Sequence, residues 1–523
     1  MKKIINYLRI KKWRTLQIII LLFIVSLLQV GTSYIQVFSF NRLVKFDFIG
    51  FLKIELINLF LWIILLLLSY LTKMKKEKLV TSLSLIMRER YSSLIANQSY
   101  VDYKSKKPDE YASTINNDIE LIEMNGFKSF FALVETIFVM VFSLIALTLF
   151  HYSLFIVTIV FTVILTFIPN LFANKSQRAM ERKLDADKSF LTKNLDILEG
   201  FNVLFSANKM GLIPRRIRKN SLELQDEKIR YTKVSGGIST IINFISISSQ
   251  MLLSIYTGFL VYKGFVTLGV VGSVGSIAGN VFNSLTVISS YLIQIKSIEN
   301  IFKKIPSGNV SVKEATNTSK FLDLDINNLS LKYNEEYIFK DLSLHIKKGG
   351  KYVIVGESGS GKTRLFKRVQ NYEGSIYLNH KDIRNYVDRD IYNIISYGGQ
   401  DKYIFDTSLK NNLTLWSSVS DEEVSKVVEL CNIKYLNLES PVSSSVLSEG
   451  EKQRIVLART LILNKDIIFI DEGTANLDKD NAKVIEKMLL TLKDKTVVMI
   501  SHNLFEENTK YIDKIIDISK YNV

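Results

Sequence analysis

Eight consecutive residues have the types and spacing of a phosphate-binding loop. They follow the apolar run Tyr352 to Val355 and precede a stretch with helical periodicity, which is the context this pattern requires. The glycines let successive backbone N–H groups converge on phosphate oxygens, and the start of the helix adds a favourable dipole. We therefore expect a nucleotide-phosphate site here, although a chance glycine-rich turn is the alternative. The loop consists of Gly356, Glu357, Ser358, Gly359, Ser360, Gly361, Lys362 and Thr363.

Two adjacent carboxylates follow a second apolar run, Ile467 to Ile470. In phosphoryl transfer, Lys362 would neutralise the β- and γ-phosphates, and the hydroxyl of Thr363 would bind Mg²⁺. Asp471 is then suited to hold the same ion, and Glu472 is suited to activate water as a general base. The alternative is an ordinary buried strand that enters a polar loop. Beside a phosphate loop, however, such a carboxylate pair is the expected partner.

Further motifs resemble those of the ATP-binding cassette (ABC) transporters. The segment Leu447-Ser448-Glu449-Gly450 resembles the signature sequence of that family, which phosphate-loop kinases and GTPases lack. The other matches occur in the order the family has. Gln400 resembles the Q-loop glutamine, Asp478 lies in a D-loop-like stretch, His502 resembles the switch histidine, and Tyr333 resembles the aromatic residue that stacks on adenine.

The resemblance implies a dimer with ATP and Mg²⁺ as cofactors. In the family, each ATP lies between the phosphate loop of one subunit and the signature of the other, so that Leu447, Ser448, Gly450 and Asp478 would reach a partner's nucleotide. His502 would steady the γ-phosphate. Mg²⁺ would be held by Thr363, Gln400 and Asp471, and Gln400 would also sense the membrane domain.

Two signature residues depart from the family pattern. Glu449 stands where glycine is usual, and Glu451 stands where glutamine is common. A carboxylate at position 449 could weaken closure on ATP, or it could point away toward solvent. Because no catalytic group is missing, two copies could form two competent sites. We expect a homodimer, while a heterodimer with a second half-transporter stays open.

The first 300 residues differ in composition from the rest. The chain is 47% hydrophobic, and its apolar runs are long enough to cross a bilayer. The formal net charge is +16, with about +18 in residues 1–320 and about −2 in residues 321–523. The near-neutral second part argues against a nucleic-acid-binding domain. Basic residues mark cytoplasmic loops. We predict six spans, at about 16–38, 51–72, 130–150, 152–173, 237–262 and 266–292.

These patterns predict a multi-domain membrane protein. An all-α transmembrane domain, residues 1–302, which resembles the exporter type, is followed by a polar linker, 303–320, and an α/β phosphate-loop ATPase domain, 321–523. The N-terminus and the ATPase domain are expected in the cytoplasm of a bacterium, with the spans in the plasma membrane. The single cysteine, Cys431, permits no intramolecular disulfide and suggests a structural thiol.

Polar residues recur at helical spacing within two of the predicted spans. Asn243 and Gln250 share a stripe in the fifth span, and Asn280 and Asn283 share one in the sixth. Such stripes either line a cavity for substrate or hydrogen-bond neighbouring helices. Glu135 lies in the third span, where a carboxylate is costly and often functional, unless it lies near the cytoplasmic end and snorkels.

The sequence therefore predicts a dimeric, ATP-hydrolysing transporter that exports a peptide or an amphipathic small molecule. Two alternatives keep the same ATPase: an importer of exporter-like shape, of the siderophore type, and a non-pumping protein that gates a channel or sensor. Intact Lys362 and Glu472 argue against the second alternative. The sequence identifies neither the substrate nor the direction of transport.

Overall fold

The computed structural model divides into two compact units, Met1–Val312 and Lys313–Val523. The divide falls within the polar stretch 303–320. The structure describes residues 1–306, 308, 311–312, 320–333, 336–356, 372–386, 388–399, 402–433, 436–474, 477–501 and 504–521.

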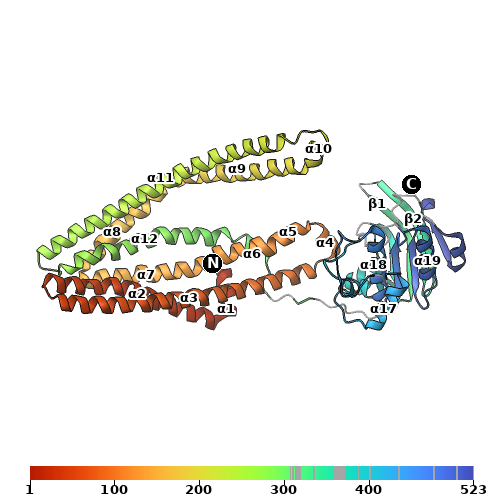
Figure 1. Ribbon diagram of the computed structural model, residues 1–523, viewed down its shortest axis with the longest axis horizontal. Coiled ribbons are helices and arrows are strands. Elements are labelled where there is room, and N and C mark those ends of the chain that lie inside the picture. The colour runs from red at the N-terminus through yellow and green to blue at the C-terminus, as the bar shows by residue number, and fades with distance from the viewer. Residues whose placement is uncertain are drawn as a thin grey trace. The chain divides into compact units, whose positions relative to one another are not determined.

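The first unit is helical throughout its described elements (Figure 1). Two π-helical turns, η1 and η2, interrupt the segment before α7. The elements are α1 (Lys2–Ile10), α2 (Lys12–Val44), α3 (Phe48–Ala96), α4 (Tyr100–Lys104), α5 (Pro108–Ser113), η1 (Thr114–Asp118), α6 (Ile119–Leu121), η2 (Ile122–Lys128), α7 (Ser129–Phe150), α8 (Tyr152–Leu171), α9 (Ala173–Glu199), α10 (Phe201–Ser206), α11 (Leu212–Tyr262), α12 (Gly269–Ser297) and α13 (Ile301–Lys304).

Among the described residues, five helical segments are long and apolar enough to cross a membrane. The predicted span 152–173 falls on α8, whose apolar portion with described side chains, Tyr152–Leu165, is shorter. Six spans therefore stay a prediction. The five segments are Lys12–Val44, Phe48–Ala96, Pro108–Phe150, Leu212–Tyr262 and Gly269–Lys304.

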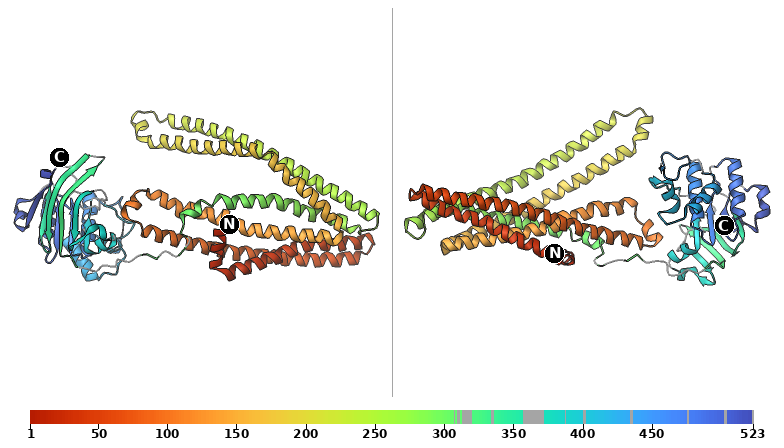
Figure 2. Two further views of the ribbon diagram at one scale, coloured as in Figure 1. Left: turned by 180° about the vertical axis from the view of Figure 1, so that it is seen from behind. Right: turned by 60° about the horizontal axis from the view of Figure 1, so that its bottom comes forward.

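Helices α2, α3, α7 and α12 form the packed part of the first unit, and α9 and α11 run side by side as an arm that diverges from them (Figures 1 and 2). Glycines allow close packing of α12. A Cβ added to Gly269 would lie 2.3 Å from the backbone oxygen of Val37 in α2, and one added to Gly279 would lie 3.1 Å from the amide of Gln250 in α11. These two glycines therefore lie where α12 packs against α2 and α11.

The second unit contains a four-stranded sheet of order β2-β1-β4-β5 and a five-stranded parallel sheet of order β11-β3-β10-β9-β6. The strands are β1 (Asp323–Tyr333), β2 (Glu336–Lys347), β3 (Lys351–Val355), β4 (Tyr372–Leu378), β5 (Lys381–Asp382), β6 (Ile395–Gly398), β7 (Thr407–Ser408), β8 (Pro441–Val442), β9 (Ile467–Asp471), β10 (Thr496–Ile500) and β11 (Lys514–Asp517). The helices are η3 (Ile383–Asn385), α15 (Asp388–Ile394), α16 (Leu409–Thr414), α17 (Asp421–Leu430), α18 (Glu449–Ile462), α19 (Lys479–Leu490), η4 (Glu506–Tyr511) and η5 (Ile518–Tyr521).

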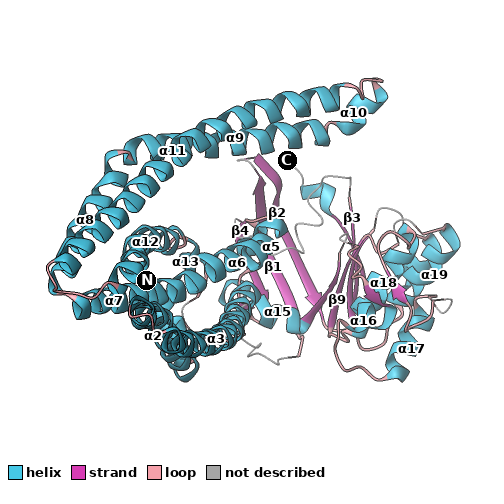
Figure 3. Ribbon diagram, turned by 60° about the vertical axis from the view of Figure 1, so that its left-hand side comes forward, coloured by secondary structure: helices cyan, strands magenta, loops and turns pink. Residues whose placement is uncertain are grey.

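The parallel sheet is buried on both faces, as the continuous apolar runs of its strands predict. Side chains alternate along each strand. Ile354 of β3 and Val498 of β10 therefore join the core beneath the antiparallel sheet, whereas Val353 and Met499 join the core beneath α16 to α19. Figure 3 shows the two layers on opposite sides of the parallel sheet. The predicted α/β fold of this unit is confirmed.

Cys431 lies at the end of α17 and is fully buried in the helical core. Burial raises the pKa of its thiol from 9.0 to about 12, because an apolar environment disfavours the thiolate. The neutral thiol thus favours the folded state below about pH 9, and this contribution is lost as the pH rises toward 12.

We predict that Cys431 reacts with a maleimide at pH 8 about a thousandfold more slowly in the folded protein than in denaturant, because the thiolate is rarer by that factor. Labelling followed by mass spectrometry measures both rates, and the Cys431→Ser variant gives the background. Equal rates in the folded and unfolded protein would show that the thiol is accessible.

Candidate nucleotide site

The parallel sheet brings the predicted catalytic motifs to one edge. Strands β3, β10 and β9 run in register, with Ile500 opposite both Ile354 and Asp471. Their carboxyl ends therefore lie side by side, where open α/β sheets bind ligands. Gly356 follows β3 there, with a positive φ of 154° that suits glycine. Asp471 ends β9, and Glu472 follows it.

Asp471 and Glu472 are held in different ways at this edge. Asp471 is fully buried, and its Oδ2 accepts a hydrogen bond of 3.2 Å from the hydroxyl of Tyr397. Glu472 is half-buried, with a left-handed φ of 55°. This conformation costs a non-glycine residue about 1–2 kcal/mol and is found often at functional sites. Its N–H donates to the carbonyl of Ile500 at 3.2 Å, and its carbonyl accepts from Gln453.

Several predicted site residues lie outside the described part of the chain. For Tyr333, the last residue of β1, the backbone is described but the side chain is not. Gln400 and His502 directly follow described residues at the carboxyl ends of β6 and β10. The residues outside the described ranges are Glu357, Ser358, Gly359, Ser360, Gly361, Lys362, Thr363, Gln400 and His502.

Ser448 is exposed at the start of α18, with Leu447 buried before it. The Ser448 hydroxyl accepts from the N–H of Glu451 at 3.3 Å, and the Glu451 carboxylate accepts from the N–H of Ser448 at 2.8 Å. This reciprocal pair is a capping box, which satisfies two N–H groups at the start of the helix. The unusual Glu451 thus has a structural role that fixes the signature turn.

Glu449 is bound by two lysines. Its carboxylate lies 2.9 Å from Lys452 Nζ and 3.5 Å from Lys402 Nζ. The two lysine side chains are only 13% and 16% exposed, whereas that of Glu449 is 61% exposed. The hydrogen bond from Lys452, the charge of the same lysine and the nearby Lys402 lower the pKa of Glu449. The carboxylate is therefore ionised at neutral pH, and its charge is compensated within the same subunit.

The signature helix is also tied to the segment that follows the Q-loop, a link that sequence reasoning missed. Arg459 of α18 donates 2.8 Å and 3.1 Å hydrogen bonds to the carbonyls of Asn412 and Tyr403. Lys402 reaches Glu449 in the same region. No sequence pattern marks these contacts, because the partners are 47 and 56 positions apart.

Asp478 caps α19. Its carboxylate accepts from the backbone N–H of Asn481 at 3.0 Å and from the Asn481 amide at 2.7 Å. The bond from the backbone N–H is the main cause of the lowered pKa of Asp478. The predicted ATP-contacting role of this residue is therefore accompanied by a helix-capping role.

The polar residues predicted to line a substrate path occupy different environments. Asn243 and Asn283 are exposed within the first unit, and Asn280 is half-buried. Gln250 is half-buried against Gly279, and its side-chain amide donates a hydrogen bond of 3.4 Å to the hydroxyl of Ser246. Gln250 thus takes part in packing α11 on α12, while Asn243 and Asn283 are accessible to a ligand in this single chain.

Two carboxylates lie within predicted spans. Glu135 of α7 is half-buried, and its backbone oxygen accepts from the buried Ser26 of α2 at 3.4 Å. The carboxylate of Glu55 in α3, a residue that the sequence analysis did not single out, accepts a hydrogen bond of 2.5 Å from the hydroxyl of Ser39 in α2. Its position inside span 51–72 could have drawn attention to it.

Comparisons with known proteins agree with this geometry. Residues 339–475 match the family model described as "ABC transporter". A probable ABC transporter ATP-binding/permease protein of Haemophilus influenzae is 26% identical over 86% of this chain and 85% of its own length. A putative export ATP-binding/permease protein of Rickettsia felis is 26% identical over 98% of this chain and 93% of its own length. The chain belongs to the ABC transporters.

The solved structure of a bacterial Atm1-family ABC exporter with ATP bound has the same fold, with a TM-score of 0.75. It is 18% identical and covers 97% of this chain, which itself covers 94% of that exporter. The protein is thus an exporter-type half-transporter, with a multi-pass helical membrane domain and an ATPase domain on one chain. It couples ATP hydrolysis to transport, and the predicted exporter function is confirmed over the importer and non-pumping alternatives.

We predict that Glu449→Gln lowers the apparent KM for ATP about two- to fivefold at low salt. The substitution leaves the charges of Lys402 and Lys452 uncompensated at the signature surface, where they attract the nucleotide phosphates. ATPase assays at low and high ionic strength measure the effect, which screening should reduce.

The control for this experiment is Glu422→Gln, the same change at an exposed position in the first turn of α17. It should leave the KM for ATP unchanged. An unchanged or raised KM in the Glu449 variant would contradict the electrostatic argument.

Proposed function

We propose that two copies of this chain form an exporter that uses Mg²⁺-dependent ATP hydrolysis to move a peptide or an amphipathic compound out of a bacterial cell. The observation that carries the proposal is the shared sheet edge at which Gly356, Asp471 and Glu472 meet. Both the N-terminus and the ATPase domain lie in the cytoplasm, where ATP is available.

Within each ATPase domain, Gly356 to Thr363 hold the phosphates, and Lys362 neutralises their charge. Thr363, Gln400 and Asp471 hold Mg²⁺, which stabilises the charge that develops on the transferred phosphoryl group. Glu472 accepts a proton from the attacking water, and His502 steadies the γ-phosphate. The burial of Asp471 and the strained backbone of Glu472 support these roles.

A second subunit completes each site. Ser448 is exposed at the start of α18, where the helix dipole and free N–H groups favour a phosphate of the partner's ATP. At the tip of the arm formed by α9 and α11, the short helix α10 exposes Phe201, Val203 and Phe205. Adjacent exposed apolar side chains of this kind are suited to a protein partner. A homodimer is the simplest assembly, because the chain carries both halves of the site.

The proposed cargo rests on the relatives and on the membrane helices. A microcin-J25 export ATP-binding/permease protein of Escherichia coli is 28% identical over 57% of this chain and 55% of its own length. Asn243 and Asn283 offer accessible, uncharged hydrogen-bonding groups on α11 and α12. Such groups suit a cargo with many amide bonds, together with Gln250, Asn280 and Glu135 at less exposed positions.

We predict that Glu472→Gln reduces ATP hydrolysis at least about a hundredfold in proteoliposomes, because the amide cannot accept the proton from water. Cargo flux should stop with it, while ATP still binds. Glu422→Gln on α17 is the matched control and should hydrolyse ATP at the wild-type rate. If Glu472→Gln hydrolyses ATP as fast as the wild type, Glu472 is not the base.

We predict that Glu135→Gln changes transport or cargo-stimulated ATPase activity severalfold while basal hydrolysis persists, because the change removes a charge within a predicted span. The matched variant is Glu55→Gln, whose amide can still accept from Ser39, so transport should change little. Unchanged transport in the Glu135 variant would remove this residue from the cargo path.

A further inference from the structure

The outer face of the antiparallel sheet carries an unusual row of side chains. Leu324 and Ile326 of β1 face the core, so the alternating residues Asp323 and Asp325 point to the opposite face. His345 of β2 is directly paired with Asp325 and lies on the same face. His345 on β2 and His380 after β4 therefore flank the two carboxylates of β1. They are two of the four histidines in the chain.

The backbone fixes the fourth member of the row. His380 follows β4 in the two-residue turn to β5, where Asn379 and His380 have φ values of 50° and 63°. The N–H of Asn379 donates to the carbonyl of Asp323 at 3.0 Å. The side-chain oxygen of Asn379 accepts a hydrogen bond of 2.8 Å from the N–H of Leu322. The turn thus holds the imidazole of His380 beside β1.

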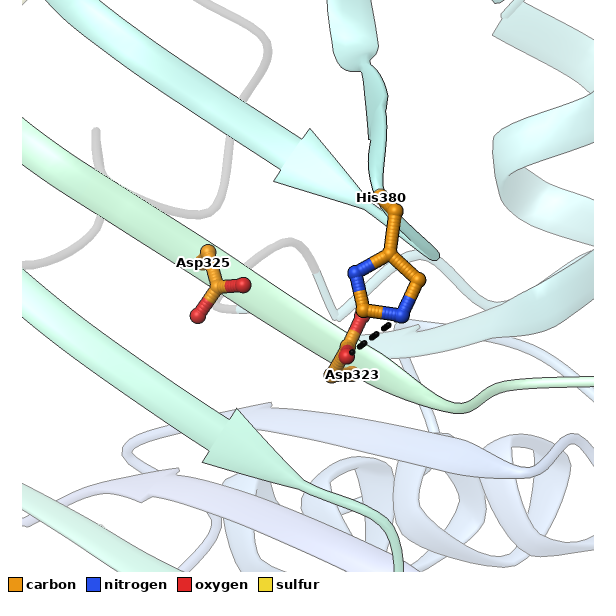
Figure 4. A group of neighbouring side chains, drawn as sticks. All are labelled: Asp323, Asp325 and His380. Atoms are coloured by element: carbon orange, nitrogen blue, oxygen red, sulfur yellow. Dashed lines mark ion pairs between the residues drawn. The ribbon is translucent and has the colours of Figure 1, made fainter.

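The side chains converge as metal ligands do. His380 Nε2 lies 3.2 Å from Asp323 Oδ2, and His345 Nδ1 contacts Asp325 Oδ1. One ligand atom from each of Asp323, Asp325 and His380 lies within 4.8 Å of the others (Figure 4). Ligand atoms around a tetrahedral zinc ion are about 3.4 Å apart, given bonds of about 2.1 Å.

One atom in the row has no hydrogen-bonding partner in the described part of the chain. Asp323 Oδ1 is buried at the atomic level, although its side chain as a whole is 15% exposed. A buried carboxylate oxygen without a partner is costly, because it has lost its water. The two carboxylates of the row together carry two negative charges, which one divalent cation would compensate.

We propose that Asp323, Asp325 and His380 bind a divalent transition-metal ion, with Zn²⁺ the best match and with His345 in contact with the ligand Asp325. Imidazole nitrogens together with carboxylate oxygens suit Zn²⁺, whereas Mg²⁺ prefers oxygen ligands alone. The ion would link β1 and the β4–β5 turn. It would stabilise this sheet by binding only the folded state, because the unfolded chain does not bring the three ligands together.

The test uses the full chain in nanodiscs, without a histidine tag and without nucleotide. Isothermal titration with Zn²⁺ should give one site per chain, and Zn²⁺ should raise the unfolding temperature of the wild-type ATPase domain. Titration with Co²⁺ should produce the intense visible absorption of a tetrahedral complex. His380→Ala and Asp323→Asn should each weaken Zn²⁺ binding at least about tenfold. His151→Gln is the matched control, because it removes a histidine from the turn between α7 and α8 of the first unit and should bind Zn²⁺ as the wild type does.

Binding should be the same in Glu472→Gln, which separates this proposal from that of ATP hydrolysis. No Zn²⁺ binding by the wild type would overturn the proposal, as would equal binding by the His380 and Asp323 variants. In that case the four residues form ion pairs between strands and nothing more. If a variant fails to fold, its circular dichroism reveals this, and the more conservative change His380→Gln takes its place.

Discussion

The parallel register of five short strands is the constraint on which the ATPase domain depends. Parallel strands place all their carboxyl ends at one edge, so that residues distant in sequence become neighbours there. Asp471, Glu472 and Gly356 meet because β9, β10 and β3 are paired in this way. The strands can pair only because both faces of the sheet are covered, one by the antiparallel sheet and the other by α16 to α19.

A second set of contacts ties the signature helix to its surroundings. Ser448 and Glu451 fix the first turn of α18, and Arg459 joins the last turn of this helix to the segment after the Q-loop. Glu449 and Lys402 make a further link between the same two parts. The signature turn and the segment after the Q-loop are therefore held together by side-chain contacts within one subunit.

Much of the fold follows from local pattern. Apolar runs of about 20 residues can only be helices in a bilayer, since each backbone polar group must be satisfied within the segment. The runs ending at Val355, Ile470 and Ile500 are short and apolar on both faces, which predicts buried parallel strands. The structure confirms these strands. The extent of the long helices was less predictable, because α3 and α11 continue far beyond their apolar parts into polar sequence.

The sequence by itself determined the chemistry of the site, because glycine, lysine and carboxylate positions in the nucleotide motifs are set by what phosphate and Mg²⁺ require. It could not determine how Glu449 is accommodated, since its partner Lys402 is 47 positions away and comes near only when α18 packs beside the Q-loop segment. The row from Asp323 to His380 was equally hidden. Its members are ordinary surface residues in the sequence, and only antiparallel pairing with a tight turn brings imidazole and carboxylate together on one face.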